Sequence, residues 1–206
     1  YGYAAAYTAM DELVGGLDDA ALARLLAAAY AGESAYERPG TGGQGAPTGW
    51  RRFLDLVEDR TANPTAAQTY RAWVLPEDKA GELALRERAR AAYRAADDAD
   101  ADWRPPLGLR RLMTDWQFTR AEQALAELGP AVVAAGRLQR ESRAAGLDGP
   151  AAVRQAYETA DSSAEYRVVA ALVPRALEVL DQVAAASRAA AAYADPFTRL
   201  GELIVG

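Results

Sequence analysis

The sequence of 206 residues contains no histidine and no cysteine. Histidine is the commonest general base at neutral pH and the commonest metal ligand, whereas cysteine supplies thiolate nucleophiles, disulfides and thiolate metal sites. Their absence excludes Ser-His-Asp and Cys-His triads, zinc sites built on imidazole or thiolate, and histidine-ligated haem. We therefore expect a chain that is not an enzyme by itself and holds no metal or cofactor. The missing cysteine suits an extracytoplasmic and a cytoplasmic compartment equally.

Positive charge is also scarce, because 23 lysine and arginine residues stand against 29 acidic ones and give a net charge of −6. A phosphate backbone is bound by a concentrated basic surface, so we expect no nucleic-acid partner. No run approaches the roughly 20 apolar residues that a bilayer span needs, so we expect no membrane span in this chain. Because the chain begins at Tyr1 rather than methionine, we expect a piece of a longer protein.

Strand signals are nearly missing, since Ile204 is the single isoleucine and no alternating run is bounded by turn residues. Helical periodicity and capping signals occur throughout instead. The sequence therefore predicts an all-α fold of about eight to ten helices stacked as helical hairpins, with no sheet. We expect one helical array over residues 1–206, with a division into subdomains 1–75 and 76–206 as an alternative.

Individual helix boundaries follow from caps, glycines and prolines. We expect helices over 3–14, from Asp18 to about 36, 50–60, 64–73, 76–99, 150–157 and 161–193, and a last one from 195. After Pro105 and Pro106, Leu109, Leu112, Met113 and Trp116 follow at helical spacing, and Thr119 is expected to cap a helix whose pattern continues to Val133 and Leu138. Pro130 is expected to kink one helix rather than separate two. The predicted inward stripes of the first two helices are Tyr3, Tyr7, Met10 and Val14, and Leu22, Leu25, Leu26 and Tyr30. Residues 37–49 hold five glycines and two prolines and are expected to form a flexible loop.

Two sets of acidic residues invite a functional interpretation. The run Asp97–Asp102 lacks the glycine and glutamate positions of a calcium loop, so we interpret it as a solvated helix end. Asp55 with Glu58, or Asp115 with Glu122, could serve as paired catalytic carboxylates only if they faced each other across a cleft. We interpret these pairs as surface acids.

The aromatic residues around Pro105 and Pro106 are more informative. Tyr93, Trp103, Trp116 and Phe118 occur there at helical spacing, which favours core packing between neighbouring helices. The alternative is a ligand pocket or partner surface. Its candidate residues are Tyr93, Trp103, Arg110 and Trp116.

A scattered set of apolar, arginine and proline positions resembles a known family region. The positions are Leu85, Arg86, Ala89, Arg90, Tyr93, Trp103, Pro105, Pro106, Arg110, Met113, Trp116, Phe118, Ala121, Arg137 and Ala145–Leu147. Further similar segments are Tyr3–Tyr36, Trp50, Leu54–Leu56, Trp73–Val74 and Asp195–Gly201. Together they resemble the C-terminal helical region of large extracytoplasmic proteins from high-GC bacteria, where it follows a gluzincin-like (M1-related) metallopeptidase domain.

This resemblance implies a secreted or membrane-anchored parent protein and a helical accessory region without chemistry of its own. The family's zinc motif, His-Glu-x-x-His with a downstream Glu, has no counterpart in a histidine-free chain, so no catalytic residue carries over. The leading hypothesis is a non-catalytic accessory or interaction domain whose partner is an upstream catalytic-like domain or another protein. The alternative is a ligand-sensing extracytoplasmic helical bundle of a transmembrane receptor.

Overall fold

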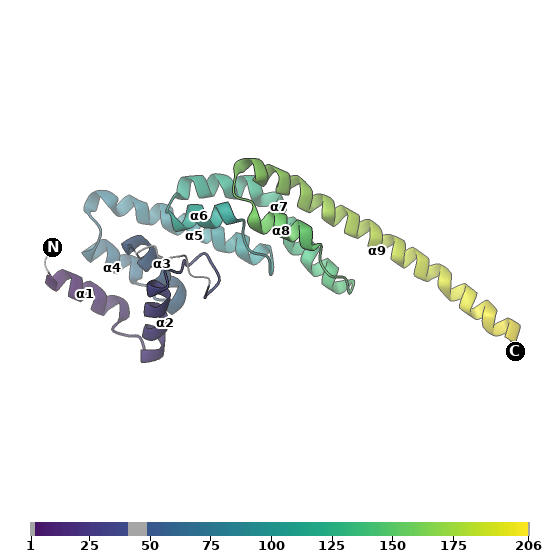
Figure 1. Cartoon of the computed structure of the whole chain (residues 1–206), viewed down its shortest axis with the longest axis horizontal. Coiled ribbons are helices and arrows are strands. Elements are labelled where there is room, and N and C mark those ends of the chain that lie inside the picture. The colour runs from purple at the N-terminus through teal and green to yellow at the C-terminus, as the bar shows by residue number, and fades with distance from the viewer. Residues whose placement is uncertain (1–2, 41–48, 206) are drawn as a thin grey trace. The chain divides into compact units, whose positions relative to one another are not determined.

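A computed structural model describes the backbone of residues 3–40 and 49–205, and the side chains of residues 3–40 and 49–192. Nine α-helices and no strand occur among these residues, which confirms the predicted all-α fold. The helices are α1 (Tyr3–Val14), α2 (Asp19–Tyr30), α3 (Trp50–Thr61), α4 (Ala66–Trp73), α5 (Ala80–Ala99), α6 (Leu107–Thr114), α7 (Phe118–Ala144), α8 (Ala151–Thr159) and α9 (Ser163–Val205), with a 3₁₀ turn η1 (Glu77–Lys79) before α5. Figure 1 shows them in chain order from purple to yellow.

The contacts divide the chain into two compact units. Unit 1 comprises residues 1–91 and 110–122, and unit 2 comprises residues 92–109 and 123–206. The division passes through α5, α6 and α7, so each of these helices contributes residues to both units. The boundary considered from the sequence, between residues 75 and 76, lies inside unit 1.

Unit 1 begins with helices whose ends follow local capping rules. The carboxylate of Asp18 accepts a hydrogen bond of 2.7 Å from the backbone N–H of Ala21 and starts α2. Gly32, with a φ of 67°, ends that helix, which therefore stops at Tyr30 rather than near residue 36. Helix α1 packs on α4, where Trp73 Nε1 donates to Glu12 Oε1 at 3.1 Å.

The predicted inward stripes of α1 and α2 are largely wrong. The buried residues of α1 are Ala9 and Leu13, whereas Tyr3 is 90% exposed and Tyr7 is 67% exposed. In α2 only Leu25 of the predicted stripe is buried, and Tyr30 is 97% exposed. The packed face of each helix combines one alanine with one leucine, namely Ala9 and Leu13 on α1 and Leu25 and Ala28 on α2.

Helices α3 and α5 supply the core of unit 1, as their patterns predict. Leu54 and Val57 on α3 are fully buried, and Leu83 and Ala89 on α5 are buried as well. Burial of such side chains stabilises the fold by about 1.5–3 kcal/mol each. The predicted loop at 37–49 falls mainly on residues 41–48, which lie outside the described residues.

Unit 2 is assembled around close contacts to glycine. The N–H of Gly108 donates to the carbonyl of Ala160 at 3.0 Å, and a Cβ at Gly108 would overlap the hydroxyl of Tyr166. A Cβ at Gly136 on α7 would likewise overlap the carbonyl of Ala99 at the end of α5. Both positions therefore require glycine for the neighbouring backbone to approach.

Two long helices complete unit 2. Helix α7 continues through Pro130, so the prediction of one helix rather than two is confirmed. The predicted start of a separate helix at Asp195 is wrong, because α9 runs without interruption from Ser163 to Val205. Residues 189–192, just before this position, are four consecutive alanines, and alanine is the strongest helix former.

Candidate functional site

The four residues singled out from the sequence are all buried, but they belong to different units. Arg110 and Trp116 lie in unit 1, whereas Tyr93 and Trp103 lie in unit 2. Their exposed fractions range from 2% for Trp103 to 9% for Trp116. Each unit therefore offers its own candidate site.

The site of unit 1 is centred on the carboxylate of Asp55, which α3 places in the core between Leu54 and Leu56. Arg86 on α5 donates from Nε to Asp55 Oδ1 at 2.7 Å and brings Nη2 to 2.6 Å from the same oxygen. One turn further along α5, Arg90 Nη1 donates to Asp55 Oδ1 at 3.1 Å. Both arginines are at most 4% exposed, so two positive charges are buried against this carboxylate.

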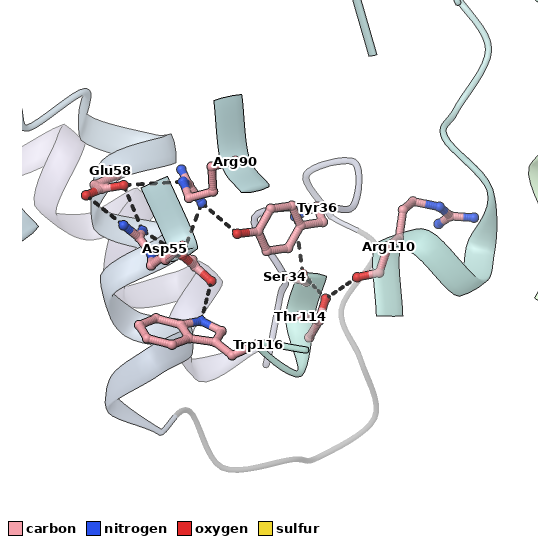
Figure 2. A network of polar contacts seen from close by, with 9 residues as sticks. Ser34, Tyr36, Asp55, Glu58, Arg90, Arg110, Thr114 and Trp116 are labelled. Carbon is pink, nitrogen blue, oxygen red and sulfur yellow. Dashed lines mark hydrogen bonds and ion pairs between the residues drawn. The ribbon is translucent and has the colours of Figure 1, made fainter. Parts of the chain in front are cut away.

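The second oxygen of Asp55 accepts a hydrogen bond of 2.9 Å from the indole Nε1 of Trp116 (Figure 2). Trp116 follows the end of α6 with a φ of 58°, a left-handed conformation that is costly for a side chain other than glycine. The guanidinium of Arg86 also lies 5.5 Å from the centre of the Trp116 ring, within the range of a cation–π interaction. The turn after α6 thus aims the indole into the network.

Glu58 and Tyr36 extend the network at its edges. Glu58, one helical turn after Asp55, accepts from Arg86 Nη2 at 2.7 Å and lies 3.4 Å from Arg90 Nε. Arg90 donates to the hydroxyl of Tyr36 at 3.0 Å, and burial raises the pKa of that hydroxyl, with Asp55 adding to the rise. The interpretation of Asp55 and Glu58 as surface acids is therefore wrong, because Asp55 is 2% exposed.

The protonation of Asp55 follows from these contacts. Burial raises the pKa of its carboxyl, and the charges of Arg86 and Arg90 with the indole N–H of Trp116 oppose that rise. All the groups that contact the two oxygens are hydrogen-bond donors, so a proton on the carboxyl would meet no acceptor. We infer that Asp55 is ionised at neutral pH, where it ties α3, α5 and the turn after α6 together.

Arg110 lies on the other side of Tyr36 and has a related structural role. Its guanidinium forms an ion pair with Glu37, and its backbone carbonyl accepts from Thr114 Oγ1 at 2.9 Å. Thr114 in turn shares a hydrogen bond of 2.7 Å with Ser34 (Figure 2). These contacts fasten the segment after α2 onto α6.

A cavity of about 380 Å³ lies beside the network and is lined by Trp116. Leu85 and Phe118 provide further apolar walls, while Arg51 and Arg120 contribute positive charge to the rim. Arg51 is held by an ion pair of 2.8 Å with Glu82 and stacks over Trp116 at 5.4 Å. The cavity thus combines an aromatic wall with two guanidinium groups.

The site of unit 2 is a second buried carboxyl, Asp100, just beyond the end of α5. It is fully buried, and its Oδ2 accepts a hydrogen bond of 3.0 Å from the hydroxyl of Tyr157 on α8. Its Oδ1 has no hydrogen-bond partner. The prediction of a solvated helix end is therefore wrong for this residue, although Asp97, Asp98 and Asp102 are exposed.

The surroundings of Asp100 favour its neutral form. Burial raises its pKa to about 8, the hydrogen bond from Tyr157 opposes the rise, and the negative charges of Asp97 and Glu158 add to it. The positive charge of Arg154 lowers the pKa of Asp100. The hydrogen bonds of this guanidinium, however, go to Glu158 at 2.7 Å and to the backbone carbonyl of Asp102. Asp100 therefore binds a proton near neutral pH.

Trp103 packs next to this carboxyl. Its ring meets that of Tyr157 edge-on at 5.4 Å, and its Nε1 donates to Gln139 Oε1 at 2.8 Å. In unit 1 the corresponding ring contacts of Trp116 are with Trp50 and Phe118, each at 5.3 Å. The aromatic residues that were expected to form one cluster therefore divide between two cores, with Trp116 and Phe118 buried in unit 1 and Tyr93 and Trp103 buried in unit 2.

A part of this site was detectable in the sequence but was missed. Arg86 and Arg90 fall on the same helical stripe as the buried Leu83 and Tyr93, so their spacing already placed two cations on the inward face of α5. The same spacing continues from Tyr93 to Ala96 and Asp100, but Asp100 lies beyond the end of α5 and its burial depends on the packing of α8, so the spacing alone did not predict it.

Metal binding, membrane spanning and similarity to known proteins were the remaining possible indications of function. No group of three or more acidic side chains in the described part of the chain is arranged to hold a metal ion. None of the described helices is both long and apolar enough to cross a lipid bilayer. In comparisons with protein-family models, curated proteins and solved structures, the chain has no significant match.

Proposed function

We propose that this chain is a non-catalytic helical accessory domain that binds a protein partner through exposed apolar residues of unit 1. The proposal extends to a secreted or membrane-anchored parent protein with a metallopeptidase-like domain, which the sequence resemblance implies. The observation that carries the binding role is the exposure of the apolar stripes on α1 and α2. Tyr3, Tyr7 and Met10 follow one another along α1 at spacings of four and three residues and are 90%, 67% and 42% exposed.

A similar stripe is present on α2, where Leu26 is 49% exposed and Tyr30, four residues later, is 97% exposed. Tyrosine and methionine are enriched at protein interfaces, because they bury a large apolar area and, in tyrosine, retain a polar group. The interior carboxylate Asp55 supports a non-catalytic role, since three donors already occupy its oxygens. A carboxylate held in this way is a poor general base.

Hydroxyl-radical footprinting tests the proposal by comparing this chain alone with the parent protein. We expect Tyr3, Tyr7 and Tyr30 to be protected in the parent protein or its complex and to react freely in the isolated chain. Leu147, which is 47% exposed in unit 2, serves as the control residue and keeps its reactivity in both. Equal reactivity of the three tyrosines in both samples would contradict the proposal.

A second candidate function is sensing of a small ligand, and the cavity beside Trp116 favours it. Its volume of about 380 Å³, aromatic wall and two arginines suit a small aromatic carboxylate. Thermal denaturation with benzoate and indole-3-acetate tests this function. A concentration-dependent stabilisation that is lost in Arg120→Gln and retained in Arg175→Gln, an exposed arginine of α9, would support it. The absence of any shift would exclude this ligand class.

A further inference from the structure

The long helix α9 has two apolar sides, and unit 2 covers one of them. Tyr166, Val169, Val173 and Leu177 follow one another at spacings of three and four residues and are at most 8% exposed. Beyond Leu177, none of the side chains described as far as residue 192 is buried. The backbone nevertheless stays helical to Val205, a further 28 residues that span about 42 Å at 1.5 Å per residue.

The second apolar side consists of Leu172, Ala176, Val179, Val183, Ala186 and Ala190, and we refer to it as the α9 seam. The spacings along it alternate strictly between four and three residues, which is the repeat of a coiled coil. Val179 is 47% exposed and Val183 is 48% exposed. In the sequence, the same spacing continues at Tyr193, Phe197, Leu200 and Ile204.

None of the six seam positions carries a charged residue. Asp181 lies 3.4 Å from Arg137 on α7, which places α7 opposite the seam. Arg175 pairs with Glu178 on the same helix at 2.8 Å. The rest of unit 2 therefore contacts α9 through the Tyr166–Leu177 side and through Asp181, and it leaves the Val179–Val183 face uncovered.

We infer that the α9 seam pairs with the seam of a second copy of this chain in a two-stranded coiled coil. The positions that flank the seam argue for self-association. If two copies pair in register, Arg175 faces Leu180 and Gln182 faces Ser187, so no like charges meet at these positions. Alanine at three of the six seam positions lets the two helices approach closely, while Val179 and Val183 supply the apolar contact.

Light scattering coupled to size-exclusion chromatography tests the pairing. We expect the chain to have twice its mass of 21.9 kDa and to dissociate on dilution. Val179→Glu with Val183→Glu is expected to raise the dissociation constant at least tenfold. Ala185→Glu with Ala192→Glu adds the same charge to exposed positions outside the seam and is expected to leave the dimer intact.

Cysteine cross-linking distinguishes loss of pairing from loss of helix, because the chain has no cysteine of its own. Val183→Cys is expected to form a disulfide-linked dimer under mild oxidation, whereas Ala185→Cys is expected to form no disulfide cross-link between the paired chains. A monomeric mass of the unmodified chain at millimolar concentration would overturn the inference. Equal cross-linking of the two cysteine variants would overturn it as well. If the chain stays monomeric and binds a different protein through the seam, the inference of self-association is also wrong.

Discussion

Two buried carboxyl groups illustrate opposite ways to accommodate an acid in a helical interior. Asp55 in unit 1 is 2% exposed and accepts from two guanidinium groups and an indole. Asp100 in unit 2 is fully buried and accepts one hydrogen bond, from the hydroxyl of Tyr157. Similar burial therefore leads to different charge states, because in unit 1 the paired arginines stabilise the ionised form, whereas in unit 2 the carboxyl keeps its proton.

The difference has consequences for stability. A charge that is buried with its partners contributes little net stability but becomes costly as soon as a partner is removed. A carboxyl that is buried as a neutral group makes the stability depend on pH, because raising the pH removes its proton. The two units should therefore respond to different perturbations.

Removal of an arginine from the Asp55 network should have the largest effect. Arg86→Met leaves Asp55 with one guanidinium and should lower the free energy of unfolding by about 3–5 kcal/mol. Arg175→Met removes the exposed pair with Glu178 and should cost at most about 0.5 kcal/mol. Urea unfolding followed by circular dichroism measures both changes. An equal decrease in the free energy of unfolding in the two variants would show that the buried Asp55 network contributes no more to stability than an exposed ion pair.

The second prediction concerns the pH dependence that Asp100 introduces. Its pKa is about 8 in the folded chain and near the ordinary 3.8 in the unfolded chain, so folding takes up a proton between these values. Its contribution to stability is complete below about pH 4 and is lost as the pH rises to about 8.

Asp100→Asn keeps the shape of the side chain and removes this proton uptake. Its urea midpoint should therefore vary less between about pH 5 and pH 8 than that of the unmodified chain. Asp98→Asn, at an exposed position two residues away, is the matched control and should retain the original pH dependence. Identical pH profiles of the two variants would contradict the proposed role of Asp100.

A smaller effect is expected from the indole hydrogen bond to Asp55. Trp116→Phe removes a donor to a charged acceptor and should cost about 1.5–3 kcal/mol. Because the substitution also reduces side-chain volume, a double-mutant cycle with Asp55→Asn isolates the coupling between the two groups. A coupling energy near zero would show that the indole acts only through packing.

The smallest expected effect is that of the single donor to Asp100. Tyr157→Phe should cost about 1 kcal/mol, because this hydrogen bond joins two neutral groups. The pKa of Asp100 should rise further, since the hydroxyl of Tyr157 is the main influence that lowers it. NMR titration of the Asp100 carboxyl in this variant checks the direction, and a fall in the pKa would contradict the account.

The sequence was sufficient for the fold class and for most helix positions, because caps and helical periodicity act locally. The sequence did not predict which face of a helix is buried where tertiary packing determines the orientation. In α1, Tyr3 and Tyr7 form a regular apolar stripe, yet they face outward. The ionised network was partly predictable from the stripe that carries Arg86 and Arg90. Asp100 was not, because its burial depends on Tyr157, which lies 57 residues away in the chain.

Carbon-13 NMR titration of the two side-chain carboxyls tests the central claim most directly. Between about pH 6 and pH 10, Asp55 should keep the chemical shift of an ionised carboxylate throughout, whereas Asp100 should change from neutral to ionised. The midpoint for Asp100 should lie at about 8. An Asp100 carboxyl that is already ionised at pH 6, or an Asp55 carboxyl that titrates in the same range as Asp100, would contradict the assignment of opposite charge states to the two interiors.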